Sequence, residues 1–296
     1  MNVNEKCTNS TSITKWHFRT IGMGTFNYRL AAKRLAQEVM STSLFESSIG
    51  YDEKIFLNHL PDFWDQHKQV LSARVPGFGW WIWKPHFLRY CLSEIPKDEG
   101  LLYLDAGTVI SKSKEDLQNL GRILELGRDT TLIGSNSQNF SENLYTSKAL
   151  LDYLDIKEED RLSNQYWAGF LLVRNNNSGE SFVNCWANLV CKSNHSFLLP
   201  DIIKEQEVKG FVHHMHDQAV FSSLMKSFGA KSIEIDQANN YGAIRPIRHR
   251  YAFSYYETRL YIILLYKTIF MISRFKLYVL RRLYRDSLSK KPINHG

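Results

Sequence analysis

Residues 77–107 read GFGWWIWKPHFLRYCLSEIPKDEGLLYLDAG, and the rest of the predicted architecture can be built outward from them. The run over 100–104 is apolar and predicts a buried strand, and a single carboxylate, Asp105, follows it directly. An α/β sheet typically presents a catalytic or binding group in this way, at the carboxyl edge of a strand. Pro85 suits the first turn of a helix, which places Lys84 at a helix N-terminus, where anions bind.

Strands and helices are expected in alternation on both sides of this stretch. Upstream, the sequence predicts a strand over 17–21, a glycine turn and a helix over 28–39, and the segment 51–73 is expected to be helical in pieces. Downstream, we expect helices over 114–126, 148–154, 180–191 and 217–228, and strands over 131–134, 167–174 and 231–235. The expected helix N-caps are Ser113, the pair Thr146 and Ser147, and Asp217. This alternation predicts an α/β domain whose mainly parallel sheet is flanked by helices.

Length and charge limit the class of protein. The 296 residues suffice for one large α/β domain, and 44% hydrophobic with 23% charged residues is ordinary for a globular chain. The net charge of +7 is concentrated, because nine of the 37 Lys and Arg but only one of the 30 Asp and Glu lie at or beyond residue 259. The nearly neutral remainder argues against a nucleic-acid-binding protein and indicates a basic C-terminal appendage.

The cysteines and apolar runs indicate a compartment. The four cysteines have no metal-ligand spacing and no dense disulfide pattern, which favours reduced thiols. The first residues lack the apolar core of a signal peptide, and no uncharged apolar run approaches the ~18 residues of a membrane span. We therefore expect a cytoplasmic protein that is peripheral on the inner face of a membrane.

Residues 259–285 are the segment expected to touch that membrane. On a helix, Lys267, Arg274 and Arg281 recur every seven residues and share one face. The opposite side would carry Leu264, Leu265, Met271, Ile272, Phe275, Val279 and Leu283. Such a helix suits the plane of an anionic membrane surface; the alternative is a terminal helix packed on the domain with its basic residues in solvent. We accordingly divide the chain into a domain over 13–251 and a basic amphipathic tail over 252–296.

Four segments carry the chemistry-bearing residues. They are YLDAG at 103–107, AGFLLVRN at 168–175 with Gln165 just before it, HMHDQAVFS at 214–222, and RPIRHR at 245–250. On these motifs the chain resembles nucleotide-sugar glycosyltransferases of the GT-A type, above all bacterial polysaccharide-assembly enzymes with WIWKP and YLDAG motifs. It is more distantly similar to glycosyltransferase family eight, in which a YLDxD strand, an N(A/S)G strand and a DQ helix start follow in the same order. The resemblance covers roughly residues 13–251.

The resemblance implies an activity. The protein would transfer a sugar from a nucleotide-sugar donor to a hydroxyl of a glycan acceptor. The expected sugar is a hexose. A lipid-linked acceptor, as in lipopolysaccharide or other cell-surface polysaccharide assembly, would explain the basic tail. The alternative is a non-catalytic, membrane-associated protein that binds a sugar nucleotide or a glycan.

The resemblance also implies a donor site. Asp105 matches the first aspartate of the DxD motif, which meets the donor ribose or the divalent metal on the diphosphate. The implied donor-binding residues are Asp105, Lys84, Gly107, Ala168, Gly169 and Arg250. Because the second aspartate is Gly107 here, Mn²⁺ or Mg²⁺, held by Asp105 and His249, is doubtful: one carboxylate is a poor ligand set for a divalent cation. Lys84, with Arg74 or the group at 248–250, could neutralise the leaving diphosphate instead.

Asp217 and Gln218 match the DQ pair. The resemblance implies that the aspartate hydrogen-bonds the donor sugar and that the glutamine lies near the attacking acceptor, which favours a retaining transfer. His216 completes the expected catalytic set, since an inverting transfer would need a carboxylate, His214 or His216 as base. Structural roles remain open for the same residues: Asp105 as a turn cap, Asp217 as a helix cap and Gln165 as a partner of buried backbone.

Overall fold

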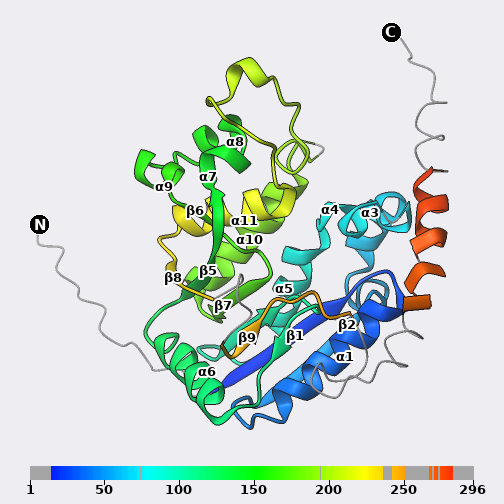
Figure 1. Ribbon diagram of the computed structural model, residues 1–296, viewed down its shortest axis with the longest axis vertical. Coiled ribbons are helices and arrows are strands. Elements are labelled where there is room, and N and C mark those ends of the chain that lie inside the picture. Colours follow the sequence, from blue (N-terminus) through cyan, green and yellow to red (C-terminus); the bar gives the residue numbers. More distant parts are fainter. Residues whose placement is uncertain are drawn as a thin grey trace, which may run out of the picture.

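A mixed sheet of seven strands runs through the part of the chain that the computed structural model describes, which is residues 15–73, 75–193, 195–235, 242–250, 267–268, 270–272 and 274–282 (Figure 1). The strands follow the order β2-β1-β3-β7-β5-β6, and β8 also pairs with β5. Their bounds are β1 Trp16–Gly22, β2 Ser47–Asp52, β3 Gly100–Leu104, β5 Leu132–Ser141, β6 Asn164–Tyr166, β7 Phe170–Arg174 and β8 Lys231–Ile233. A separate pair joins β4 (Val109–Ile110) to β9 (Ile244–Arg245).

The strand directions confirm the expected α/β class with a mainly parallel sheet. Strand β1 is parallel to β2 and to β3, and β5 is parallel to β8. Strand β7 lies antiparallel between β3 and β5, and β6 is antiparallel to β5. Five of these strands therefore point the same way, and only β6 and β7 run against them.

Helices cover both faces of the sheet. Their bounds are α1 Phe26–Met40, α2 Lys54–His59, α3 Pro61–Ala73, α4 Gly77–Trp80, α5 Trp83–Ser93, α6 Lys114–Leu126, α7 Glu142–Tyr145, α8 Lys148–Tyr153, α9 Glu158–Leu162, α10 Asn177–Cys191 and α11 His216–Ser227. Residues 267–268, 270–272 and 274–282 are also helical. None of the helices in the described ranges is both long enough and apolar enough to cross a bilayer.

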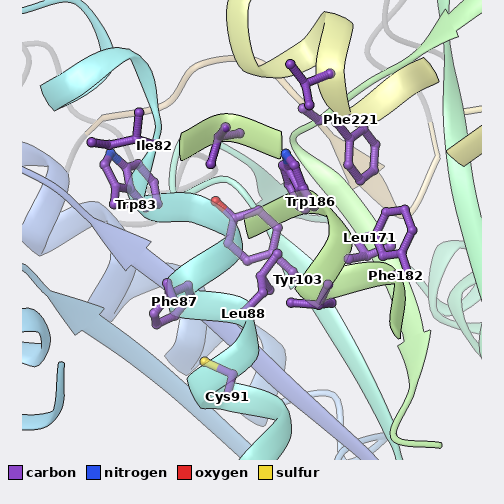
Figure 2. Close-up of a cluster of buried hydrophobic side chains, with 14 of the residues drawn as sticks. Ile82, Trp83, Phe87, Leu88, Cys91, Tyr103, Leu171, Phe182, Trp186 and Phe221 are labelled. Carbon is purple, nitrogen blue, oxygen red and sulfur yellow. The ribbon is translucent and has the colours of Figure 1, made fainter. Parts of the chain in front are cut away.

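Strand β3 is buried on both faces, which explains why it is apolar until Asp105. Leu102 and Leu104 face one core, which includes Leu35 of α1 and Leu120 of α6. Leu101 and Tyr103 face the other core, built with side chains of α5, α10 and α11. Figure 2 shows the Tyr103 ring in this second core among Phe87, Leu88, Phe182 and Trp186.

Several predicted elements match the structure closely. The strand over 100–104 and the helix over 114–126 have the predicted bounds, and the Ser113 hydroxyl caps the helix by accepting from the Asp116 amide at 3.2 Å. Ser147 does take the N-cap position of α8, but no side-chain capping bond forms there.

Other elements differ from the sequence-based expectation. The half-buried strand β2 was not predicted, because its sequence SSIGYD is polar and glycine-containing, and its position is set by pairing with β1. Strand β5 extends to Ser141 because its second half pairs with β6. The predicted cap at Asp217 is wrong: Met215 takes the N-cap position of α11, and the Asp217 carboxylate bonds to another helix.

Two histidines are buried in neutral form where α3, α5 and α10 meet. Nε2 of His86 lies 3.4 Å from the Cys191 sulfur, and Nε2 of His67 lies 3.7 Å from it. Burial lowers the pKa of His67 to about 4 and that of His86 to about 3, with smaller contributions from neighbouring positive charges. Both rings therefore resist protonation while the protein is folded.

These depressed pKa values predict acid sensitivity. In the unfolded chain both histidines titrate near 6.5, so their contribution to stability is complete above pH 6.5 and is lost as pH falls toward 4. At pH 5.5 each histidine should lower the free energy of unfolding by about 1.4 kcal/mol relative to pH 7.5. Urea unfolding at the two pH values measures this loss. His86→Gln should lose about 1.4 kcal/mol less than the wild type over that interval; equal losses would contradict the assignment.

Candidate functional site

Three charged residues from three elements meet at the carboxyl edge of β3. Lys84 comes from the first turn of α5, Asp105 follows β3, and Asp217 lies in the first turn of α11. The Lys84 ammonium donates to Asp217 Oδ2 at 2.9 Å and to the Ala168 carbonyl at 3.1 Å, and it lies 3.5 Å from Asp105 Oδ1. Because an ammonium has three N–H groups, all of its hydrogen-bonding capacity is directed at protein groups.

This ion cluster is buried at one end and open at the other. The Lys84 side chain is 2% exposed, and burial opposes its charge, but Asp105 and Asp217 more than offset this and raise the pKa of Lys84. Removing one partner of such a buried pair typically costs about 3–5 kcal/mol. Asp105 is 38% exposed, so it is the member of the cluster that can reach a ligand.

Neighbouring residues fix the orientation of Asp105. The Tyr103 hydroxyl donates to Asp105 Oδ1 at 2.7 Å, and burial raises the pKa of Tyr103 so that it remains a donor. The Asp105 amide donates to the Gly169 carbonyl at 3.0 Å. Gly169 is required there, because an added Cβ would lie 2.3 Å from the Trp167 ring. Ala168 and Gly169, predicted as donor-binding residues, thus act on Lys84 and Asp105 through their backbone carbonyls.

A chain of amides orients Gln218. The Gln165 amide nitrogen donates to Glu142 Oε1, to the Tyr145 carbonyl and to Thr146 Oγ1, at 3.3, 3.2 and 2.9 Å. These are three acceptors, so Gln165 must turn its oxygen toward Gln218, whose amide nitrogen donates to it at 2.9 Å. Because the amide nitrogen of Gln218 bonds to Gln165, its amide oxygen can accept a hydrogen bond from a ligand in the cavity that Gln218 lines.

A fully buried carboxylate anchors this chain. Glu142 of α7 pairs with Lys226 of α11 at 2.8 Å and accepts hydrogen bonds from Thr146 and Ser222. Sequence reasoning missed Glu142 and Lys226, because each looks like an ordinary solvated charge. Only the packing of α7 against α11 brings them together.

The two histidine candidates differ in their capacity to act as a base. His214 Nδ1 accepts the Ser147 amide at 3.1 Å, and burial lowers the pKa of His214 to about 3. His216 Nδ1 lies 3.1 Å from the Leu198 carbonyl, to which it must donate, so Nε2 of the neutral ring is the acceptor. His216 also lines a cavity, which makes it the better placed of the two.

Two adjoining cavities open around these residues. The larger, of about 850 Å³, is lined by Asp105, Gly107 and Gln218, by aromatic side chains, and by four arginines discussed below. The smaller, of about 260 Å³, is lined by Lys84, His216 and Asp217 together with Ala168 and Gly169. Trp81, Asp105, Trp167, Met215 and Gln218 line both. The predicted residues of the strand end, the AG segment and the DQ pair are therefore brought together in space.

Backbone packing explains the glycine at position 107. The His249 amide donates to the Gly107 carbonyl at 2.8 Å, and a Cβ at position 107 would lie 3.1 Å from the Arg248 Cα. Buried Arg34 fastens the same junction by donating to the carbonyls of Ala106, Thr108 and His249 at 2.9–3.2 Å. An aspartate at position 107 would have to displace the backbone of Arg248.

The residues around Asp105 do not fit a divalent cation. Asp105 already faces the Lys84 ammonium, and the other nearby carboxylate, Asp217, is paired with it. Across the described ranges no group of three His, Cys, Asp or Glu side chains is arranged to hold a metal. His249 is buried and does not line the larger cavity, whereas its neighbours Arg248 and Arg250 do. Arg74 lies outside the described residues.

Comparison with known proteins yields structural likenesses alone. No family model and no curated protein sequence matches the chain. Among solved structures, it is similar to a glycosyltransferase involved in glycosylation of the major capsid of PBCV-1, with 10% identity over 78% of this chain and 93% of that one and a TM-score of 0.44. It is also similar to mouse xyloside xylosyltransferase 1 (9% identity, 75% and 85% covered, TM-score 0.40). A third similar structure is the galactosyltransferase LgtC in complex with donor and acceptor sugar analogues, with 13% identity over 73% of this chain and 72% of that one and a TM-score of 0.37. At this level of identity and superposition, the likenesses assign the chain neither a family nor an activity.

Proposed function

We propose that the protein is a glycosyltransferase of the GT-A type that moves a sugar, a hexose, from a nucleotide-sugar donor to a hydroxyl of a glycan acceptor. The observation that carries this proposal is the ion cluster of Lys84, Asp105 and Asp217 at the junction of the two cavities. A cavity of about 850 Å³ with aromatic walls, one exposed carboxylate and several cations has the size and chemistry for a nucleotide with a charged diphosphate.

Each member of the site has a role in this proposal. Asp105 accepts hydrogen bonds from hydroxyls of the donor, and Gly107, on the wall of the larger cavity, lets the Arg248 backbone pack beside the donor site. Asp217, in the smaller cavity, bonds to the transferred sugar, and Gln218 offers its amide oxygen to a sugar hydroxyl. Arg250, on the wall of the larger cavity, faces the nucleotide portion of the donor. Lys84 positions the two carboxylates.

The transfer itself needs one bond to form and one to break. The acceptor oxygen bonds to the anomeric carbon while the bond from that carbon to the phosphate oxygen breaks, and the diphosphate leaves with the electron pair. We favour retention of configuration, in which the acceptor enters on the face that the diphosphate leaves and the departing oxygen can take the proton. In an inverting transfer, Nε2 of His216 is the base that the site offers.

The described helical residues 267–268, 270–272 and 274–282, here called the C-terminal helical segment, have an outer side that supports a membrane-bound acceptor. Met271, Ile272, Phe275 and Tyr278 are 60–70% exposed. Lys276 and Arg282 are exposed beside them. An apolar side flanked by cations suits the surface of an anionic bilayer. We therefore propose a cytoplasmic enzyme, peripheral on the inner face of the membrane, that acts on a lipid-linked glycan such as a lipopolysaccharide or other cell-surface polysaccharide precursor.

Replacing Asp105 tests the catalytic proposal. Asp105→Asn keeps the shape of a partly exposed side chain but removes one of the two charges beside Lys84. We therefore expect a lower melting temperature with a cooperative transition retained, because Asp217 still pairs with the ammonium, and activity is compared well below that transition. Release of nucleoside diphosphate from the preferred donor should fall by about 10²-fold or more. Unchanged release would contradict the assignment of the site. Tight donor binding without turnover by the wild type, across a panel of sugar nucleotides, would favour the alternative of a non-catalytic binding protein.

Replacing the exposed apolar side chains tests the membrane proposal. Phe275, 70% exposed, should insert into the bilayer surface, so Phe275→Asp should strongly reduce co-sedimentation with vesicles containing anionic lipid. Leu162→Asp is the matched control, because Leu162 is 61% exposed but lies on α9, outside the described cavity walls. Equal sedimentation of both variants and the wild type would contradict the proposal.

A further inference from the structure

Four arginines from two distant segments line the larger cavity. Arg248 and Arg250 follow β9, and Arg274 and Arg281 lie on the C-terminal helical segment, drawn in orange to red in Figure 1. On the described part of this wall, Asp105 is the one acidic residue. The electrostatic potential of the cavity is therefore strongly positive, which favours an anion over a cation.

Aromatic rings hold two of these guanidinium groups in place. The Arg250 guanidinium carbon lies 5.0 Å from the centre of the Tyr28 ring and 5.7 Å from that of Phe270. The Arg274 guanidinium carbon lies 5.7 Å from the same Phe270 ring. Contact with a ring face occupies the flat side of a guanidinium and leaves its N–H edge available, and that edge matches two phosphate oxygens.

The like charges are also close enough to affect one another. Burial lowers the pKa of Arg281, and the charge of Arg274 lowers it further. Both Arg248 and Arg274 act on the Tyr28 hydroxyl, as does Arg250. Such a cluster carries an electrostatic cost that a polyanion in the cavity would relieve.

One member of the cluster, Arg248, passes beside the residue that stands at the second aspartate position of the DxD pattern, Gly107. The backbone of Arg248 stands 3.1 Å from the position that a Cβ at residue 107 would occupy. Arg248 itself adopts a left-handed backbone conformation, with φ of 56°, as it passes this point. The residue that packs against Gly107 is therefore an arginine that also lines the cavity.

From this geometry we infer that the cavity binds the donor diphosphate directly through Arg248, Arg250 and Arg274, with Arg281 in support, and without a divalent cation. The inference rests on the proposed function, since it assigns the anionic part of the proposed donor. Bidentate pairing of guanidinium with phosphate supplies both the charge and the geometry that a metal would otherwise provide. It also makes the C-terminal segment part of the donor site, because Phe270 and Arg274 complete its wall.

The test is calorimetric titration of the full chain with inorganic pyrophosphate and with UDP, GDP, CDP and dTDP, each in EDTA and in Mn²⁺. We expect binding in EDTA, with a Kd that Mn²⁺ changes by less than about threefold. Arg274→Gln should weaken binding by roughly tenfold or more, the usual worth of a charge-assisted hydrogen bond. Arg248→Gln, at another exposed position on the wall, should do the same.

Arg282→Gln is the matched control, because it removes the same charge from an exposed residue of the same segment that does not line the cavity. It should leave the Kd within about twofold of the wild type. Binding that requires Mn²⁺, or equal weakening by Arg274→Gln and Arg282→Gln, would overturn the inference while leaving the proposed function intact. Pyrophosphate binding with no gain from any nucleoside would instead count against the proposed function. Absence of all binding would overturn both.

Discussion

The burial of one ammonium group between two carboxylates constrains the rest of the site. Lys84 can remain charged at 2% exposure only if Asp105 and Asp217 stay beside it. That requirement ties the start of α5, the end of β3 and the start of α11 to one point. Asp217 lies inside the first turn of α11, after the N-cap residue Met215, and its carboxylate bonds to Lys84 of α5. The Gln165–Gln218 chain and the Arg34 junction then fix the walls around that point, so that the exposed oxygen of Asp105 and the amide oxygen of Gln218 are held ready for a ligand.

The C-terminal helical segment explains where part of the basic charge at the end of the sequence lies. Arg274 and Arg281 face the cavity, together with Phe270 and Leu277. The side chains of Met271, Ile272 and Phe275 face outward. The segment therefore carries apolar side chains on both sides: Phe270 and Leu277 are half-buried toward the cavity, and Met271 and Phe275 are exposed on the outside. On our proposals, one segment meets the donor diphosphate with one side and the membrane with the other, which would couple the site to the surface that carries its acceptor.

Local sequence signals predicted much of the fold, and they succeeded for elements whose burial pattern or capping residue is visible in their own sequence. The strand over 100–104 is buried on both faces and is therefore continuously apolar, and the helix over 114–126 carries its own cap at Ser113. Strand β2 escaped prediction because its pairing with β1, rather than its composition, makes it a strand. For the site, the strand end and the DQ pair could be named from motifs. The burial of Lys84, the Glu142–Lys226 anchor and the arrival of Arg274 at the cavity depend on contacts between distant segments, which no local pattern records.

On our proposals, the ion cluster of Lys84, Asp105 and Asp217 and the arginine-lined cavity form a sugar-nucleotide site that works without a metal. The most direct measurement is nucleotide release by the full chain, in EDTA and in Mn²⁺, from a panel of sugar nucleotides. UDP-, GDP- and dTDP-sugars would release the nucleoside diphosphate, and CMP-sugars would release CMP. The account predicts turnover of one donor class at similar rates under both conditions. Failure to release a nucleotide from any donor under either condition would contradict it.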